Sequence, residues 1–236
     1  MRYVWSSASH KGMVRDNNED AAFPDTSGES TDSAVLIVAD GMGGHVAGEV
    51  ASRIAVNTAA SSDLEPEDRV AAANRAIREE VAREPSLDGM GTTMTLLLLD
   101  DRGIAHLAHV GDSRAYLLRG EDMQQLTEDH TVAAEAVSTG QISEDDARNH
   151  PQRHMLTRCL GLTRFVNVDS IKVELEPGDR ILVCSDGLTD MITDEEVKEA
   201  LEKRSSVDDV AWHLIELANG AGGVDNITVI VADVTD

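Results

Sequence analysis

Short apolar runs, separated by polar turns rich in glycine and aspartate, follow one another along most of this chain. Runs of this length that end at turn residues predict strands that are largely buried. Turns are expected at 100–103 and 177–179, where Asp, Gly and Pro gather. The strands predicted in this way are 34–39, 92–99, 104–110, 114–118, 166–175, 180–184 and 226–232. A flexible loop is expected directly after the first of these strands, at 40–44.

Helical periodicity appears between groups of strands. Pro66 stands at a predicted helix start, and the acidic residues Glu67 and Asp68 in the first turn favour that position. The predicted helices are 46–60, 66–83, a pair within 131–147 that is broken near Gly140, 194–203 and 207–219. Strands outnumber long helices, and the helices come in pairs. This order favours an α+β fold with two packed sheets flanked by helix pairs over a repeated βαβ unit.

The composition is that of a globular protein with few aromatic residues. Hydrophobic residues make up 41% of the 236 positions and aromatic residues 3%, so the core must consist mainly of Val, Ile, Leu, Ala and Met. No linker, repeat or low-complexity segment divides the chain. One domain covering residues 1–236 is therefore the simplest interpretation.

The charge balance excludes two classes of partner. The chain has 20 basic and 44 acidic side chains, a formal net charge of −24. Such a chain repels nucleic acid and anionic lipid, so neither is expected as a partner. The acidity can equally serve solubility alone.

The two cysteines, Cys159 and Cys184, lie among apolar neighbours and lack the spacing of a disulfide framework or a zinc site. Residues 1–7 show no signal-peptide pattern, and no run approaches the roughly 18 apolar residues of a membrane span. These features favour a cytoplasmic protein with reduced thiols.

Acidic residues recur where apolar strands end. Asp40, Asp112, Asp186 and Asp225 each border a predicted strand and have Gly, Ser or Asn beside them, and the pair Glu19 and Asp20 is a fifth acidic position. Any one of these aspartates is explained by a turn that it caps. Together they indicate a metal site, because carboxylates aimed at one point repel one another unless cations lie between them. Oxygen ligands favour magnesium, manganese or calcium.

Several familiar catalytic motifs are absent from the sequence. A cysteine phosphatase needs an arginine six positions after its cysteine, where Cys159 has Phe165 and Cys184 has Asp190. The chain has no Asp-x-Asp triplet of an aspartyl-phosphate enzyme and no Gly-x-x-x-x-Gly-Lys phosphate loop.

Eight motifs occur in one order over residues 9–231. They are RDNNED at 15–20, DGMGG at 40–44, GTT at 91–93, GDSR at 111–114, LTEDH at 126–130, LTR at 156–158, SDGLTD at 185–190 and DNIT at 225–228. Taken together they resemble the bacterial metal-dependent protein phosphatases, the type 2C serine/threonine phosphatases. The resemblance implies a four-layer α-β-β-α sandwich with two antiparallel sheets and with metals at one end.

The resemblance also implies a ligand set for two core ions, manganese or magnesium. Asp40 would bridge both ions, Asp186 and Asp225 would complete the first site, and Glu19 with the Gly41 carbonyl would complete the second.

A third, weaker ion is implied at Asp112 and Asp186. Asp20 and Asn226 would be neighbours that support the ligands. Arg15 matches the arginine that binds phosphate, where its other interpretation is a surface ion pair with Asp16 or Glu19. Residues 131–158 correspond to a mobile flap.

The implied reaction is hydrolysis of phosphoserine and phosphothreonine in proteins by a metal-activated water. Expected partners are phosphorylated proteins, including serine/threonine kinases, and a monomer is expected. Two alternatives stand beside it: a catalytically weak relative that binds phosphoproteins, and a phosphatase dedicated to one regulatory partner. One departure concerns Met42, which replaces the histidine of animal members. The proton donor is therefore open: it is a metal-bound water or another histidine, with His130, His150 and His154 as candidates near the flap.

Overall fold

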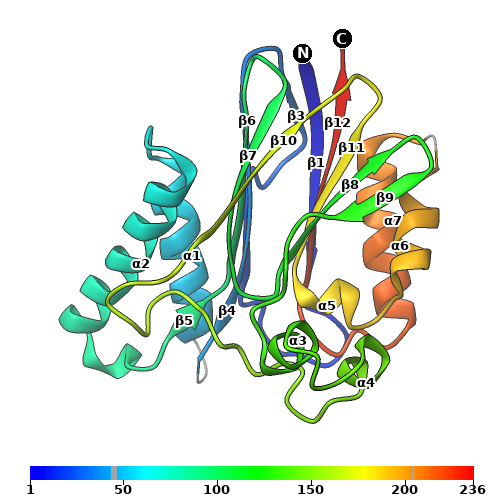
Figure 1. The fold of residues 1–236 in the computed structure, drawn as a ribbon. Coiled ribbons are helices and arrows are strands. Elements are labelled where there is room, and N and C mark those ends of the chain that lie inside the picture. Colours follow the sequence, from blue (N-terminus) through cyan, green and yellow to red (C-terminus); the bar gives the residue numbers. More distant parts are fainter. Residues whose placement is uncertain (44–46, 204) are drawn as a thin grey trace.

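The computed structural model describes residues 1–43, 47–203 and 205–236. Two antiparallel sheets pack face to face, with helices covering both outer faces (Figure 1). The strands are β1 (Arg2–His10), β2 (Asp20–Phe23), β3 (Gly28–Ser30), β4 (Ala34–Met42), β5 (Gly91–Thr92), β6 (Met94–Leu99), β7 (Ile104–Val110), β8 (Arg114–Arg119), β9 (Asp122–Gln125), β10 (Asp169–Glu174), β11 (Arg180–Cys184) and β12 (Ile227–Thr235). The helices are α1 (Ala47–Ala60), α2 (Pro66–Arg83), α3 (Val132–Ser138), α4 (Glu144–Arg148), α5 (Asp186–Thr189), α6 (Asp194–Leu201) and α7 (Val207–Gly220), with a short 3₁₀ turn at Pro85–Leu87.

The strand order explains why distant parts of the sequence meet. One sheet has the order β3-β1-β12-β11-β8-β9, and the other has the order β10-β7-β6-β4-β2 with β5 beside β4. The first and last strands, β1 and β12, pair along their whole length, from Arg2 opposite Thr235 to His10 opposite Ile227. Both chain ends therefore lie at the same end of the sandwich, and α3 and α4 lie at the other (Figure 1).

Three apolar clusters hold the four layers together. The middle cluster joins the inner faces of the two sheets through residues such as Leu36, Leu97 and Ile181. A second cluster packs α1 and α2 on one sheet, and a third packs α5, α6 and α7 on the other. The predicted four-layer α-β-β-α fold is thus confirmed, and its core is mostly aliphatic, as the low aromatic content requires.

The loop expected at 40–44 is wrong for the residues that the structure describes. Strand β4 continues through Met42, since Gly41 and Met42 pair with β5. The Asp40 carbonyl accepts hydrogen bonds from the Thr93 N–H at 2.9 Å and from the Thr92 hydroxyl at 2.8 Å. This pairing outweighs the low strand propensity of Asp and Gly. Gly44, in the same expected loop, and Val46, the expected first residue of the next helix, lie outside the described residues.

Five elements were not expected: β1, β2, β3, β9 and α5. Strand β1 carries several serines, so its sequence lacks a continuous apolar run. Ser6 is nevertheless fully buried, because its hydroxyl donates to Asp208 Oδ1 at 2.8 Å. The strand expected at 166–175 begins only at Asp169. The helix pair expected within 131–147 is confirmed as α3 and α4.

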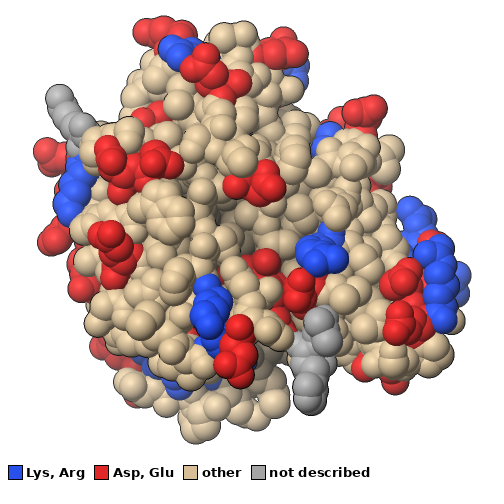
Figure 2. All heavy atoms as spheres, turned by 180° about the vertical axis from the view of Figure 1, so that it is seen from behind, with Lys and Arg blue, Asp and Glu red and all other residues tan. Residues whose placement is uncertain are grey.

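Charged side chains are scattered over the surface and do not form one large field. On the face shown in Figure 2, acidic groups lie all over the surface, several of them next to a lysine or arginine. Within the described parts of the chain, no helix has the length and apolar character needed to cross a membrane.

Candidate metal centre

Five aspartates from separate parts of the chain meet at the end of the sandwich opposite the chain termini. Asp40 lies near the end of β4, and Asp20 is its direct partner on β2. Asp112 follows β7, Asp186 begins α5 directly after β11, and Asp225 precedes β12. This group, together with Glu19, is called the carboxylate cluster below.

The carboxylate cluster carries more negative charge than the surrounding protein neutralises. Desolvation and the nearby Asp186, Asp20 and Asp112 raise the pKa of Asp40 well above its ordinary value. Desolvation, with repulsion from other aspartates, raises the pKa of Asp186 to about 6 and that of Asp20 to about 7. The pKa of Asp112 is also raised well above its usual range, chiefly by burial and by Asp186. Such shifts mark carboxylates whose charged form lacks a partner.

Two carboxylate oxygens of the cluster are buried without a hydrogen-bond partner in the described part of the chain. Asp20 Oδ1 and Asp186 Oδ1 are buried and have no hydrogen-bond partner among the residues that the structure describes. A buried carboxylate oxygen without a partner costs free energy, which a bound cation would recover. All the donors are oxygens, so the residues present fit hard divalent ions such as Mg²⁺ or Mn²⁺.

Glu19 and Gly41 form a second oxygen group beside α1. A Cβ atom at Gly48 would lie 2.5 Å from Glu19 Oε2 and 2.8 Å from the Gly41 carbonyl oxygen. The two oxygens therefore face the same narrow space, which only a glycine at position 48 leaves open. The Glu19 backbone is held because its carbonyl accepts from the Gly41 N–H at 3.1 Å and from the Ser52 hydroxyl at 2.6 Å.

Asp20 and Asn226 connect the segments that carry these oxygens. Asn226 Oδ1 accepts from the Glu19 N–H at 2.7 Å, and its Nδ2 donates to the carbonyls of Lys11 and Asn17. Asp20 Oδ2 accepts from the Ser185 hydroxyl at 2.7 Å. Both side chains thus link separate segments of the chain beside the cluster.

Arg15 lies at the mouth of the cluster. Its guanidinium contacts Asp225 Oδ2 at 2.6 Å, and its side chain is 54% exposed. In the described part of the chain, this is the single ion pair that the cluster makes with a lysine or arginine. The alternative pairing of Arg15 with Asp16 or Glu19 is not what the structure contains.

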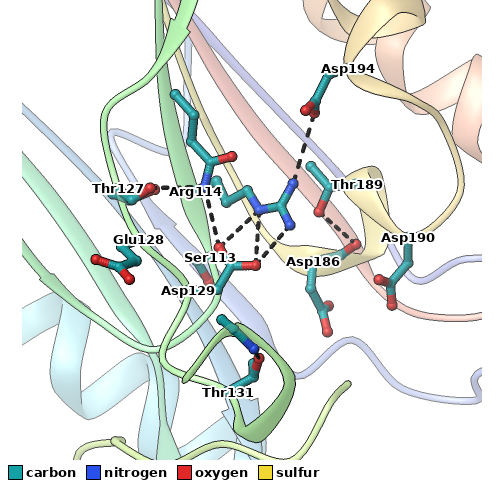
Figure 3. A network of polar contacts seen from close by, with 12 residues as sticks. Ser113, Arg114, Thr127, Glu128, Asp129, Thr131, Asp186, Thr189, Asp190 and Asp194 are labelled. Carbon is teal, nitrogen blue, oxygen red and sulfur yellow. Dashed lines mark hydrogen bonds and ion pairs between the residues drawn. The ribbon is translucent and has the colours of Figure 1, made fainter. Parts of the chain in front are cut away.

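Asp190 belongs beside the cluster, although the sequence analysis did not select it. One ligand atom each from His154, Asp186 and Asp190 lie within 4.8 Å of one another. Asp190 stands four positions after Asp186, so one helical turn brings both to the same side (Figure 3). That spacing was the signal available in the sequence.

A cleft of about 850 Å³ leads to the cluster. One wall carries Asp112, Asp186 and Asp190, and the other belongs to residues 131–158, including Ala133 and His154. In the close view of this region, the Arg114 guanidinium lies between Asp129, 2.7 Å away, and Asp194, 3.8 Å away (Figure 3).

The three histidines expected near the flap differ in their environment. His130 is only 3% exposed, and both ring nitrogens are engaged, one by the Gly111 N–H and the other by Asp169. Both ring nitrogens of His130 are thus held by other residues of the protein. His150 Nδ1 accepts from the Gln152 N–H in a local turn. His154, at the cleft and 3.2 Å from Asp190, is the histidine that remains.

Known proteins share the sequence pattern. The sequence profile of the family described as protein phosphatase 2C matches residues 7–218. Serine/threonine protein phosphatase PstP of Mycobacterium tuberculosis is 42% identical over 241 residues, which cover 98% of this chain and 45% of PstP. The chain thus spans less than half the length of that relative. Serine/threonine phosphatase stp of Listeria monocytogenes is 38% identical over 238 residues, 94% of this chain and 92% of stp.

Solved structures share the fold. The crystal structure of M. tuberculosis PstP superposes with a TM-score of 0.92 at 40% identity and covers 100% of both chains. A structure of the PstP catalytic domain in complex with two manganese ions gives a TM-score of 0.88 at 39% identity, again over 100% of both chains. With a family profile over most of its length and relatives at this identity, the chain belongs to the protein phosphatase 2C family.

Proposed function

We propose that this chain is a metal-dependent protein serine/threonine phosphatase, which hydrolyses phosphoserine and phosphothreonine monoesters on proteins. The observation that carries the proposal is the carboxylate cluster, in which Asp20 Oδ1 and Asp186 Oδ1 lack partners among the described residues and the pKa values of Asp40 and Asp186 are raised. The names of the relatives, all serine/threonine or protein phosphatases, support the same reaction.

Each ligand role is proposed from the position of the oxygens. Asp40 lies at the centre, since Asp20, Asp112 and Asp186 all raise its pKa. Asp40 would therefore touch both core ions. Asp186 and Asp225 would hold the first of them.

The second core ion would be held by Glu19 and the Gly41 carbonyl, whose oxygens face one space beside Gly48. A third, weaker ion would lie at Asp112 and Asp186, with Asp190 and His154 at its edge. The fit is to Mn²⁺ or Mg²⁺, and the PstP catalytic domain binds two manganese ions.

The chain's own residues bind and orient the phosphate. Divalent ions bound here would supply a water of lowered pKa and neutralise charge on the phosphoryl oxygens. Arg15 can turn its guanidinium from Asp225 to two phosphoryl oxygens, a geometry that guanidinium groups favour. In the sum of the reaction, water adds to phosphorus, the P–O bond to the serine or threonine oxygen breaks, and the alcohol takes a proton. Met42 cannot donate that proton, and His154 is the histidine placed at the cleft to do so.

The remaining features are part of the same proposal. Residues 1–236 would form one catalytic domain, because a single middle cluster of apolar residues unites both sheets. Residues 131–158 would be a mobile flap of this domain. Substrates would be phosphorylated proteins, including serine/threonine kinases. The chain would act as a monomer in the cytoplasm, where its two free cysteines would stay reduced.

The decisive assay uses a small phosphate ester and a phosphothreonine peptide. Both should be hydrolysed in Mn²⁺, neither in EDTA, and activity should return when Mn²⁺ is added in excess. Full turnover in EDTA would refute the proposal. Binding of the peptide in Mn²⁺ with no release of phosphate would instead favour the alternative of a phosphoprotein-binding relative.

A further inference from the structure

The segment 131–158, called the flap segment, leaves and rejoins the fold at a narrow stem. The Val132 N–H donates to the Met155 carbonyl at 2.9 Å, and the Thr157 N–H donates to the His130 carbonyl at 2.8 Å. Residues 131 and 156 form an isolated bridge between these two bonds. The stem therefore decides where the whole flap segment sits against the cleft.

One carboxylate binds both sides of this stem. Asp169, the first residue of β10, accepts from His130 Nε2 on its Oδ2 at 3.1 Å and from Arg158 Nη1 on its Oδ1 at 2.7 Å. His130 precedes the flap segment and Arg158 is its last residue. Each oxygen of Asp169 thus holds one end of the flap segment to the sheet.

His130 extends the same connection to the carboxylate cluster. Its Nδ1 accepts from the Gly111 N–H at 3.0 Å, which places the ring proton on Nε2 for Asp169. The backbone N–H of His130 donates to the Gly111 carbonyl at 2.8 Å. Gly111 cannot shift easily, since it has φ +114° and a Cβ there would lie 2.5 Å from Thr93. Gly111 is followed directly by Asp112, so the stem is tied to a wall of the cleft.

We propose that Asp169 is a positioning residue that holds the flap segment as one wall of the substrate cleft. This inference rests on the proposed function. The Asp169 side chain is 36% exposed and that of Arg158 is 34% exposed. The ion pair between Asp169 and Arg158, called the clamp, therefore lies at the surface and can be broken without opening the core. A protein substrate must contact the cleft wall around the phosphorylated residue. A small phosphate ester reaches only the ions and Arg15. Asp169 therefore acts on the peptide through the flap segment, which also carries His154, and leaves hydrolysis of the small ester unchanged.

Kinetics on two substrates tests this role. Asp169→Asn keeps the shape of the side chain but loses the charge that Arg158 binds. KM for a phosphothreonine peptide should rise about fivefold to tenfold, the loss expected for one partly exposed charged hydrogen bond. KM and kcat for p-nitrophenyl phosphate should stay within about twofold, because p-nitrophenolate leaves without the proton that His154 would supply to a serine or threonine oxygen.

Two further variants separate this role from a general loss of structure. Only one guanidinium nitrogen of Arg158 contacts Asp169, so a lysine can replace it and Arg158→Lys should keep the peptide KM near the parent value. Arg158→Met removes the charge and should raise the peptide KM as Asp169→Asn does. Glu174→Gln, at the other end of the same strand, removes an equal charge and should change neither KM. An equal rise in KM for both substrates, or an unchanged peptide KM, would overturn the proposal.

Limited proteolysis gives a readout that does not need turnover. In Mn²⁺ and without substrate, protease cleavage within 131–158 should be several times faster in Asp169→Asn than in the parent or in Glu174→Gln. Equal cleavage rates would show that Asp169 does not hold the flap segment. A parent protein without phosphatase activity would refute the proposed function. The cleavage rates would still test, independently of activity, whether Asp169 holds the flap segment.

Discussion

Both ends of the sandwich carry partly or fully buried aspartates beside a hollow, but the aspartates are paired with arginines at one end and, among the described residues, mostly unpaired at the other. At the end with the chain termini, a hollow of about 820 Å³ is close in size to the 850 Å³ cleft at the carboxylate cluster. At this end, which we call the arginine end, each of three aspartates is paired with an arginine. The pairs are Asp100 with Arg102, Asp179 with Arg119 and Asp233 with Arg180.

Pairing changes the protonation of these acids. Burial alone would raise the pKa of Asp100, but hydrogen bonds from the Ile104 and Arg102 backbone and from the Arg102 side chain lower it to about 2. At the carboxylate cluster the pKa of Asp186 instead rises to about 6. The fold thus neutralises acids that serve structure and leaves other acids without partners where a cation is to bind. Volume does not distinguish the two hollows, whereas the state of their carboxylates does.

The largest expected effect comes from Asp40→Asn. Turnover in Mn²⁺ should fall roughly 1,000-fold or more, because in the proposed arrangement the charge of Asp40 would be shared by both core ions. In EDTA the same variant should melt a few degrees higher than the parent, because it relieves repulsion within the cluster. Asp233→Asn at the arginine end should do the reverse and keep activity while it lowers the Tm. A lower Tm for Asp40→Asn in EDTA would mean that the charge of Asp40 stabilises the metal-free fold, as the paired aspartates of the arginine end do.

The pH dependence of stability should also separate the ends. Asp186 has an ordinary pKa of 3.8 and a folded pKa of about 6, so the folded metal-free protein binds more protons than the unfolded chain between these values. Its contribution to the free energy of unfolding therefore falls by roughly 3 kcal/mol as the pH rises from about 4 to about 6. Asp100, with a lowered pKa, acts oppositely and loses its contribution as the pH falls from 3.8 toward about 2.

Urea unfolding in EDTA at pH 4.5 and pH 7 measures this effect. The metal-free protein should be more stable at the lower pH, and saturating Mn²⁺ should remove or invert the difference. A metal-free protein that gains stability toward pH 7 would contradict the raised pKa values of the cluster.

Arg15→Ala tests the one lysine or arginine side chain that forms an ion pair with the cluster among the described residues. Charged hydrogen bonds contribute roughly 1.5–3 kcal/mol, so kcat/KM for phosphopeptides should fall about 10- to 150-fold. The Mn²⁺ concentration for half-maximal activity should not rise, because Arg15 holds no metal. Unchanged kcat/KM would make Arg15 a surface partner of Asp225 and nothing more.

Arg119→Met is the matching change at the arginine end. The Asp179 side chain is 1% exposed and would lose its guanidinium partner, while Arg119 itself is 41% exposed. We expect a loss of about 2 kcal/mol, below the roughly 3–5 kcal/mol of a fully buried pair, and a Tm about 4–8 °C lower. Thermal unfolding measures this change, and kcat/KM should stay within about twofold. A large loss of activity at a temperature where the variant is folded would show that the two ends are coupled.

Asp112→Ala should have the smallest effect. It should raise the Mn²⁺ concentration for half-maximal activity roughly tenfold and slow turnover, since the proposed third ion would lose a ligand. The Tm at low metal should change little. If Asp112 only caps its turn, the Tm should drop by several degrees and the metal requirement should stay constant.

The positions of the acidic residues that meet in the carboxylate cluster were the easiest part of the molecule to predict. Asp112, Asp186 and Asp225 each stand beside an apolar strand and a turn residue, and a pattern of that kind is local. The aliphatic runs likewise predicted the central strands, because burial on both faces demands such runs.

Other features depend on residues that are distant in the sequence. Strand β1 exists because β12 pairs with it across more than 200 positions, and its buried Ser6 needs Asp208 as a partner. Asp40 lies inside a strand only because Thr92 and Thr93 bind its carbonyl. Local propensity does not include partners of this kind.

Sequence patterns alone predicted the family, the four layers and most of the acidic residues that meet in the carboxylate cluster. The folded protein was needed to show which acids pair with an arginine, that both ring nitrogens of His130 are hydrogen-bonded, and that Asp169 contacts both ends of the flap segment. The physical reason is that an apolar run or a turn residue acts over a few neighbouring positions. The charge state and partner of a polar side chain depend instead on the register and packing of strands that meet only in the folded protein.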